Sequence, residues 1–315
     1  MLELFFAYDR KRVAEVKAES KLVAHYTTAD TAMKIITGRS MWLRNVAVMN
    51  DWSEVSYGRA MIEPVLSGPE GQRFRAVLDG IQEGLSEQVI GSYHACLNNA
   101  REIYFTASLS EHHPSERFGR LSMWRAYGGP IAGVALLFKG DVVDLELEPT
   151  LELAASPVLY GTADQFQLEF GNMVYGLEAD IEFLKAYEDK AGMTAAASAL
   201  LQYSMLSIKH PAFSEEREWR IVHRPYEFGC EVVKGETVTL GGIPQTIFKL
   251  PFHNPDKGFE HPQLNLNDIL VGVMLGPCAY PETVFRAFVA EMTAAGIENA
   301  ASRIFPTHIP LRQQV

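Results

Sequence analysis

An excess of positive charge is the first thing that this 315-residue sequence lacks: its formal net charge is -11 at pH 7. A protein that holds nucleic acid nonspecifically needs a basic footprint, so the acidic balance disfavours a nucleic acid partner. A long apolar run is also missing. The N-terminal run from Leu2 to Tyr8 meets charged residues too early for a secretory core or a membrane span. We therefore expect a cytoplasmic protein with no membrane partner.

Cysteine is scarce as well. Cys96, Cys230 and Cys278 are odd in number, lie far apart and show no metal-ligand spacing, which fits free thiols in a reducing compartment. The sequence has no phosphate-binding glycine loop, no dinucleotide-binding glycine fingerprint and no nucleophile elbow. The run His112-His113-x-x-Glu116 lacks a second set of ligands, so we expect no metal site. Several common enzyme classes are thereby disfavoured.

Repeats and low-complexity linkers are absent too, so one α+β domain with helical insertions is the simplest architecture. Hydrophobic periodicity predicts an alternation of helices and strands along the chain. Helices are expected over 9–19, most of 54–98, 121–127, most of 165–210 and 282–295, and strands over 22–27, 103–108, 132–138, 218–223, 232–240, 246–250, 269–275 and 303–305, with a turn at 276–277.

The segment from Phe213 to Val222 is the most informative, because it places three acids and two arginines directly before an apolar strand. With a strand period of two, Glu216, Glu218 and Arg220 would share one face. Paired carboxylates backed by an arginine can stabilise a developing positive charge or accept hydrogen bonds from a sugar. A solvated edge strand whose charges pair with one another is the alternative.

Three further groups of residues bear on function. His25-Tyr26-Thr27 ends the first expected strand, where a histidine and a hydroxyl on one face suit a ribose or a carboxamide. Asn50 and Asp51, followed by Glu54, form a turn whose main expected role is to cap the next helix. Trp124 and Tyr127 share a helical face and form either plain core or a stacking wall for a flat ring. A locally satisfied core histidine is the structural alternative for His25.

Taken in order, these groups resemble the bacterial domain-of-unknown-function family 2971 over roughly residues 20–225. Its pattern combines a His-Tyr-Thr start, an Asn-Asp turn with a following Glu, a Trp-x-x-Tyr segment and a late Lys, aromatic, Glu-x-Glu-x-Arg string. The late string corresponds here to residues from Lys209 through Phe213 to Arg220. More remotely, the same order is similar to the His-Tyr-Glu class of ADP-ribosyltransferases.

The remote resemblance implies an ADP-ribosyltransferase-like split β-sandwich, in which His25, Tyr26 and Thr27 hold the ribose and nicotinamide of NAD. An aromatic, Tyr127 or Trp124, would stack on the nicotinamide ring. The resemblance further implies that Glu218 stabilises the oxocarbenium-like transition state and that Glu216 handles the acceptor, with Arg220 beside them. Tyr26 stands where many members of that class have glycine. The implied divisions are an N-terminal helix at 1–20, a core at 21–225 with helical insertions near 55–98 and 165–210, and C-terminal strands with a β-α-β extension at 226–315.

The expected function is therefore an NAD-dependent ADP-ribosyltransferase or NAD glycohydrolase, for which NAD is a substrate and no metal is needed. The acceptor is open: protein, small molecule and water are all compatible, and nucleic acid is less favoured. The alternative is a non-catalytic nucleotide- or sugar-binding module that acts as a sensor or partner in a bacterial defence or stress system. A third possibility is a metal-dependent nucleotide hydrolase that uses Asp51, Glu54 and the paired glutamates.

Overall fold

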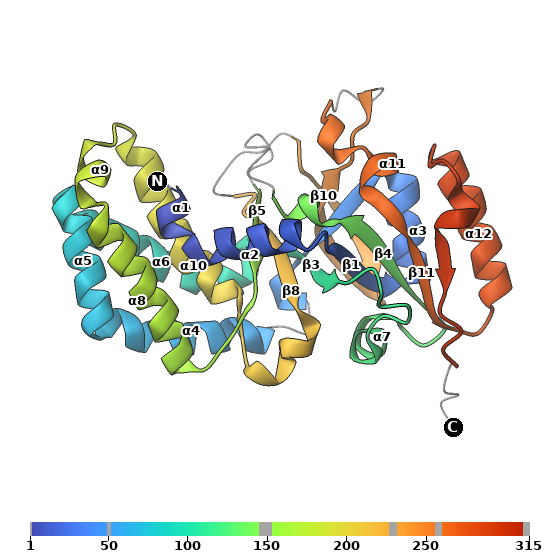
Figure 1. The fold of residues 1–315 in the computed structure, drawn as a ribbon, viewed down its shortest axis with the longest axis horizontal. Coiled ribbons are helices and arrows are strands. Elements are labelled where there is room, and N and C mark those ends of the chain that lie inside the picture. The colour runs from blue at the N-terminus through green and yellow to red at the C-terminus, as the bar shows by residue number, and fades with distance from the viewer. Residues whose placement is uncertain (1, 49–51, 145–152, 227–231, 256–259, 311–315) are drawn as a thin grey trace. The chain divides into compact units, whose positions relative to one another are not determined.

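The computed structural model describes residues 2–48, 52–144, 153–226, 232–255 and 260–310 (Figure 1). The chain separates into two compact units. Unit 1 comprises Met1–Ala14, Asn45–Tyr104 and Ser156–Glu215, and unit 2 comprises Glu15–Arg44, Phe105–Ala155 and Glu216–Val315. The expected division into 1–20, 21–225 and 226–315 stays a prediction.

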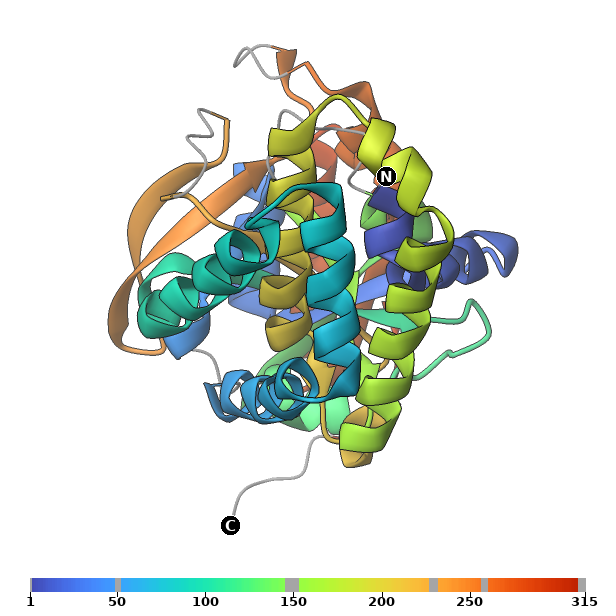
Figure 2. The same cartoon turned by 90° about the vertical axis from the view of Figure 1, so that its left-hand side faces the viewer.

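Unit 1 is built mainly from helices, which Figure 2 shows face on. Helices were expected over most of 54–98 and 165–210, and both predictions are confirmed. Apolar residues recur at helical spacing along these helices and fill the core of the unit. The elements are α1 (Leu2–Phe5), α4 (Trp52–Ser67), α5 (Pro69–Ile81), α6 (Leu85–Ile103), α8 (Ala163–Ala179), α9 (Ile181–Ala186), α10 (Lys190–Leu206) and the parallel pair β6 (Leu159–Tyr160) and β7 (Ile208–Lys209).

Unit 2 is built around a mixed sheet, so the α+β class is confirmed. In the sheet, strands follow the order β12-β11-β4-β1-β3-β2-β10-β9, and β8 also pairs with β3. The strands are β1 (Leu22–Thr28), β2 (Ser40–Asn45), β3 (Phe105–His112), β4 (Ala132–Lys139), β8 (Glu218–His223), β9 (Lys234–Leu240), β10 (Ile243–Pro251), β11 (Leu270–Cys278) and β12 (Ile304–Pro306). The helices are α3 (Ala29–Gly38), α7 (Leu121–Tyr127), α11 (Leu266–Ile269) and α12 (Pro281–Ala294), while α2 (Ala7–Ala18) and β5 (Leu153–Pro157) each contribute residues to both units.

The C-terminal part of unit 2 is a β-α-β arrangement, because β11 and β12 pair in parallel and α12 lies between them in the chain. Gly276 and Pro277 were expected to form a turn, which is wrong: both lie inside β11. A register shift between Leu275 and Cys278 accommodates them. An irregular strand end can carry a proline that a regular ladder could not.

Strand β3 is the point at which the sheet divides. Strand β8 pairs along one edge of β3 from Phe105 to Ser110. The other edge is shared, because β1 pairs only with Ser110, Glu111 and His112, while β2 is also a neighbour of β3. A strand has two edges, so β1 and β2 follow the same edge of β3 and separate along it. The sheet of unit 2 is therefore split beside β3, at the point where β1 and β2 separate. His25, which follows Ala24 in β1, lies next to this split.

No helix among the described ranges is long and apolar enough to span a bilayer.

Candidate functional site

The glutamate and arginine expected on one face of the late strand do lie together in unit 2. Strand β8 begins at Glu218, as predicted, and every residue of it is buried. Glu218 and Arg220 are each 4% exposed, and Arg220 Nε donates to Glu218 Oε1 at 2.9 Å. Charges withdrawn this far from water persist only when they are paired and hydrogen bonded. The segment is thus a buried ion pair, and the solvated edge strand is excluded.

Glu216 does not join that pair on the strand face, and the prediction that it would is wrong. It ends a 3₁₀ turn over Pro211–Glu216, and Arg217 follows with a φ of 44°, in the left-handed region. The left-handed residue breaks the alternation of side chains that a continuous strand would give. The backbone carbonyl of Glu216 accepts a hydrogen bond from Ser110 Oγ instead. Only Glu218 and Arg220 therefore present the expected chemistry on β8.

Ser108 lies directly across from Arg220 in the β3–β8 pair, and Ser110 lies across from Glu218. Residues opposite each other in an antiparallel pair share a face, so both serines lie on the face of the ion pair. Ser108 is the only residue of β3 that is not fully buried, and its Oγ has no hydrogen-bond partner among the described residues. A buried hydroxyl without a partner calls for a water or a ligand to satisfy it.

His25 lies at the split in the sheet. Its ring Nδ1 is 2.9 Å from the carbonyl oxygen of Ser108, so Nδ1 carries the proton and donates it. Burial lowers the pKa of His25, and the hydrogen bond to Ser108 only partly offsets that effect. The imidazole is therefore neutral at neutral pH, and Nε2 is left as an acceptor that suits a sugar hydroxyl. Thr27 is half-buried and lies two residues further along β1.

The strand registers place His25 and Glu218 on different faces. Ala24 pairs with Ser110, which pairs with Glu218, so these three residues share one face. His25 follows Ala24 in β1 and points to the opposite face. Ser108 links the two sides: its backbone carbonyl accepts from His25, and it lies across from Arg220, the partner of Glu218. A ligand that touches both His25 and Glu218 must occupy the split in the sheet.

Of the three aromatic candidates, Tyr26 and Trp124 are committed to the core. They are 5% and 3% exposed, and their rings meet edge to face with centroids 4.7 Å apart. The Tyr26 hydroxyl oxygen accepts from the Arg120 backbone at 3.1 Å. A Cβ added at Gly276 would lie 2.6 Å from Trp124 Cε3, so no space remains on that face of the indole. Neither ring can stack on a ligand.

Tyr127 is the aromatic of this segment that keeps part of its surface exposed. It lies at the end of α7, whose predicted bounds are confirmed, and it is half-buried at the edge of the cluster that contains Trp124. Its exposed part is the only ring surface that the Trp-x-x-Tyr segment offers to a flat molecule. Sequence spacing left the choice between the two aromatics open, and burial decides it in favour of Tyr127.

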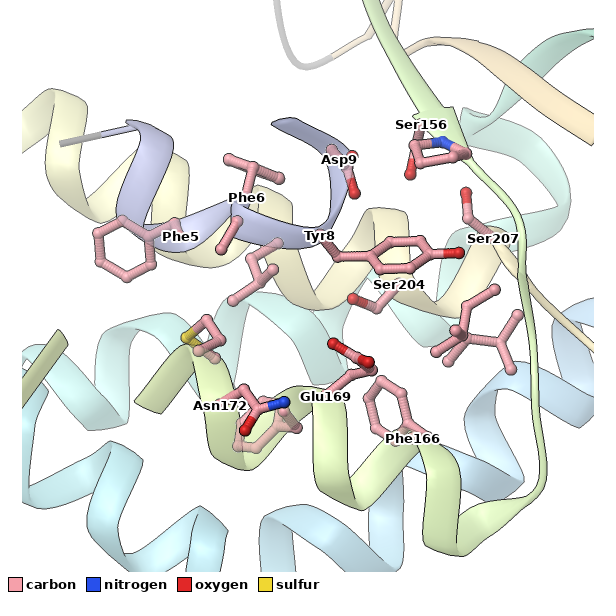
Figure 3. Close-up of a pocket in the computed structure, with 17 residues that line it drawn as sticks. Phe5, Phe6, Tyr8, Asp9, Ser156, Phe166, Glu169, Asn172, Ser204 and Ser207 are labelled. Atoms are coloured by element: carbon pink, nitrogen blue, oxygen red, sulfur yellow. The ribbon is translucent and has the colours of Figure 1, made fainter. Parts of the chain in front are cut away.

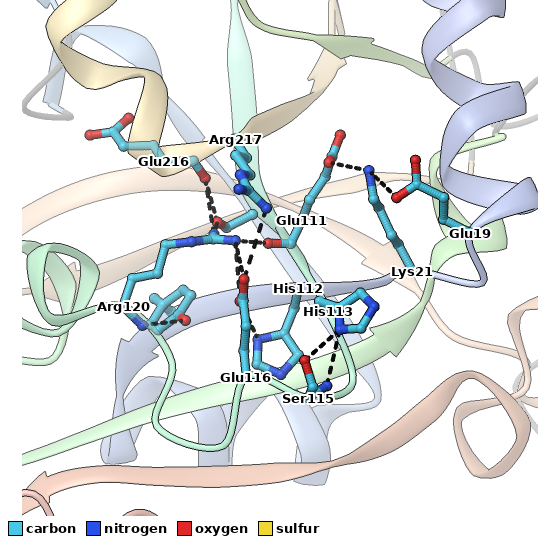
Figure 4. Close-up of polar contacts among 12 residues, drawn as sticks. Glu19, Lys21, Glu111, His112, His113, Ser115, Glu116, Arg120, Glu216 and Arg217 are labelled. Carbon is cyan, nitrogen blue, oxygen red and sulfur yellow. Dashed lines mark hydrogen bonds and ion pairs between the residues drawn. The ribbon is translucent and has the colours of Figure 1, made fainter.

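Figure 4 shows a polar network that the sequence did not reveal. Arg120 is 8% exposed and donates to Ser110 Oγ and to the carbonyl of Glu111, and its guanidinium lies 3.2 Å from the carboxylate of Glu116. Glu111 in turn accepts from Trp219 Nε1 at 3.1 Å. The network fixes the C-terminal end of β3, and with it the register of Ser108 and Ser110 against β8. No local motif marked Arg120, because its side-chain contacts to Ser110 and Glu111 form only once α7 packs back against β3.

The network also explains why His112-His113-x-x-Glu116 is a poor metal site. His112 lies inside β3, and Glu116 is engaged by Arg120. Burial lowers the pKa of His112 more than the nearby Glu116 raises it. His113 turns away to Ser115, at 2.7 Å between Nδ1 and Oγ (Figure 4). Within the described residues, no group of three metal-ligating side chains occurs.

The other residues that carry the resemblance to family 2971 belong to unit 1. Lys209 is 1% exposed, and its Nζ is 2.9 Å from Glu54, so these two residues form a second ion pair, in which the lysine is buried and the glutamate is partly exposed. Lys209 also lies 5.9 Å from the ring centroid of Phe213. Asn50 and Asp51, named for helix capping and for the metal-dependent alternative, lie outside the described residues. Glu54 is committed to Lys209, which weakens its case as a metal ligand.

A family model described as "Protein of unknown function (DUF2971)" matches residues 123–221, less than a third of the chain. The match supports the resemblance to this family over a segment that starts within α7 and ends within β8. It includes Tyr127, Lys209, Glu218 and Arg220, and it leaves out His25. No curated protein matches the chain, and neither does any solved structure.

Proposed function

We propose that unit 2 binds NAD at the split in its sheet and cleaves the nicotinamide–ribose bond, as an ADP-ribosyltransferase or an NAD glycohydrolase. The observation that carries the proposal is the convergence at Ser108. The neutral ring of His25 meets this residue from β1, and the Glu218–Arg220 pair flanks it on β8. A split sheet with these residues on its two sides supports the ADP-ribosyltransferase-like split β-sandwich as the finer description of the fold.

In the proposed reaction, the bond between ribose C1′ and the nicotinamide nitrogen breaks, and its electron pair neutralises the pyridinium ring. Positive charge then develops on the ribose. The Glu218 carboxylate stabilises that charge, and Arg220 holds the carboxylate oriented and ionised without solvent. Water or an acceptor hydroxyl next bonds to C1′ and gives up its proton to solvent. A fixed carboxylate in a dry site contributes a rate factor of about a hundred or more.

Substrate positioning falls to the other side chains. His25 Nε2 offers an acceptor to the ribose hydroxyls, and Thr27 adds a hydroxyl on the same face. Tyr127 provides the surface on which the nicotinamide ring stacks. Tyr26 and Trp124 act indirectly, by holding α7 against β1. Glu216 is half-buried beside the start of β8, and we propose it as the residue next to the acceptor.

One observation favours a second candidate, a nucleotide-binding module without turnover. Arg220 contacts both oxygens of Glu218, at 2.9 and 3.4 Å, so the carboxylate is already satisfied inside the protein. A carboxylate with a structural role would look the same. This candidate predicts that NAD raises the thermal stability of the protein without release of nicotinamide.

The test is incubation of the purified protein with NAD, with free nicotinamide as the readout and cell lysate as a source of acceptor. The enzyme reading expects Glu218→Gln to lower the release at least about a hundredfold. Glu282→Gln is the matched control, because Glu282 is exposed in the first turn of α12. Tyr127→Leu is expected to raise KM more than it lowers kcat, with the exposed Tyr280→Leu as its control. No release by the folded wild-type protein would favour the binding module.

A further inference from the structure

Unit 1 contains a cavity of about 130 Å³ that the proposed NAD chemistry does not use (Figure 3). Its wall is assembled from three separate segments: the N-terminal residues 5–9, the stretch from Ser156 to Met173, and the stretch from Leu200 to Ile208. A cavity of this size is close to the roughly 150 Å³ that accommodates a benzene ring in a protein core. The space therefore admits one small ring or a short branched chain.

Most of the wall is apolar. Phe5, Phe166, Phe170 and Met173 are each less than a tenth exposed, and the Phe166 and Phe170 rings pack with centroids 6.0 Å apart. Figure 3 shows the ring of Tyr8 across the cavity from Phe166. Aromatic walls with a few placed polar groups are typical of small-molecule sites.

The polar groups of the wall are acidic or neutral. Asp9 and Glu169 contribute carboxyl groups from α2 and α8, and no Lys, Arg or His is among the described residues that line the cavity. Ser207 is 3% exposed, and its Oγ has no hydrogen-bond partner among the described residues. A buried hydroxyl in this position calls for a ligand or a water to satisfy it. The electrostatic preference of the cavity is for a positive charge.

We propose that this cavity binds a small amine, with its flat apolar body between the aromatic side chains and its ammonium group between Asp9 and Glu169. The ammonium would donate hydrogen bonds to the two carboxyl groups and to Ser204, which lies between them in Figure 3. The proposal concerns unit 1 alone, so it holds whether or not unit 2 cleaves NAD.

The charge on Asp9 should make this binding depend on pH. Burial raises the pKa of Asp9 to about 7, although a hydrogen bond from Ser156 and the charge of Arg10 on the same helix act in the opposite direction. The other titratable groups that face Asp9 are Tyr8 on α2 and Glu169 on α8, while α10 and β7 contribute only uncharged residues to the wall. An ammonium favours the ionised carboxylate. Binding near neutral pH should therefore release a proton, and affinity should rise with pH.

Titration calorimetry on the full chain tests this with two probes, benzylamine and benzyl alcohol, at about pH 6 and about pH 8. Benzylamine is expected to bind at both pH values and about tenfold more tightly at the higher one, with proton uptake by the buffer. Benzyl alcohol, which has nearly the same shape and no charge, is expected to bind more weakly and without pH dependence.

Variants make the test specific. Asp9→Asn should abolish the pH dependence and weaken benzylamine binding about tenfold, while the matched Asp164→Asn, at an exposed position of α8, should change nothing. Ser204→Leu should fill the cavity and remove binding of both probes. Equal affinity for both probes, unchanged binding in Asp9→Asn, or binding that survives Ser204→Leu would overturn the proposal. So would a wild-type protein that binds neither probe.

Discussion

Two carboxyl groups of this chain, Asp9 in unit 1 and Glu218 in unit 2, have opposite surroundings. Glu218 has the guanidinium of Arg220 2.9 Å away on the same strand. Asp9 borders an apolar cavity, and burial raises its pKa to about 7. A buried carboxylate with a cation beside it stays charged, whereas one without close compensation takes up a proton. The comparison separates a fixed charge, suited to transition-state stabilisation, from a charge that responds to pH and ligand.

The largest stability effect is expected when the fixed pair is broken. Arg220→Met removes one partner of the buried Glu218 carboxylate, and such losses commonly cost about 3 kcal/mol or more. Chemical denaturation at neutral pH measures the change. Arg125→Met, at an exposed position on α7, is the matched control and should stay near wild type. Equal stability of both variants would mean that the Glu218–Arg220 pair is not a constraint on the fold.

A smaller effect of opposite sign is expected at Asp9. Its folded pKa lies above its unfolded value of 3.8, so wild-type stability is full below that value and is lost as pH rises towards about 7. Asp9→Asn cannot ionise, so it should be more stable than wild type by roughly 2 kcal/mol at about pH 8, less than the full shift implies because Asp9 is partly exposed. The two proteins should converge near pH 4. A variant that is less stable than wild type at every pH would show that Asp9 acts as a structural carboxylate.

His25 should give a further, smaller pH effect. Its folded pKa lies below the ordinary 6.5, so the unfolded chain binds the proton first and stability falls as pH drops through that value. His25→Gln should remove this share of the acid destabilisation, which denaturation at a series of pH values measures. The exposed His113→Gln is its control. The proposed release of nicotinamide by the wild type, in contrast, should persist below pH 6.5, because the pKa of the folded imidazole lies below that value. Loss of activity with a midpoint near 6.5 would contradict a buried His25.

The smallest effect is expected from an exposed ion pair. Arg73 on α5 contacts Glu178 on α8 at 3.0 and 2.5 Å, with both side chains more than a third exposed. The pKa of Glu178 is lowered by its hydrogen bond to Arg73. Water and salt screen such pairs, so Glu178→Gln should lower Tm only slightly, and the difference should disappear at high salt. If Glu178→Gln destabilised the protein as much as Arg220→Met, exposed and buried ion pairs would contribute equally to stability, contrary to this prediction.

The sequence was most informative where local periodicity determines the element. The bounds of β8 and α7 were predicted to the residue, and the helical segments of unit 1 were recognised from their apolar spacing.

The predictions about the site were wrong or incomplete where contacts between distant segments determine the conformation of a residue. Arg217 adopts a left-handed conformation at the end of a 3₁₀ turn, which no strand pattern announces, and this moves Glu216 away from Glu218. Trp124 became core because Gly276, more than a hundred residues later, packs against its ring. The opposite faces of His25 and Glu218 follow from the register of three strands, and the cavity of unit 1 follows from three separated segments. Such features depend on tertiary pairing, which one sequence does not encode locally.

The most direct test of the account compares binding and cleavage in a single variant. If Glu218 acts on the transition state, Glu218→Gln should bind an uncleavable carbocyclic analogue of NAD within about threefold of wild type, yet release nicotinamide from NAD at least about a hundredfold more slowly. Calorimetry and a nicotinamide assay on the same protein sample provide both numbers. Affinity that falls as far as the rate, or a rate that does not fall, would contradict the role assigned to Glu218.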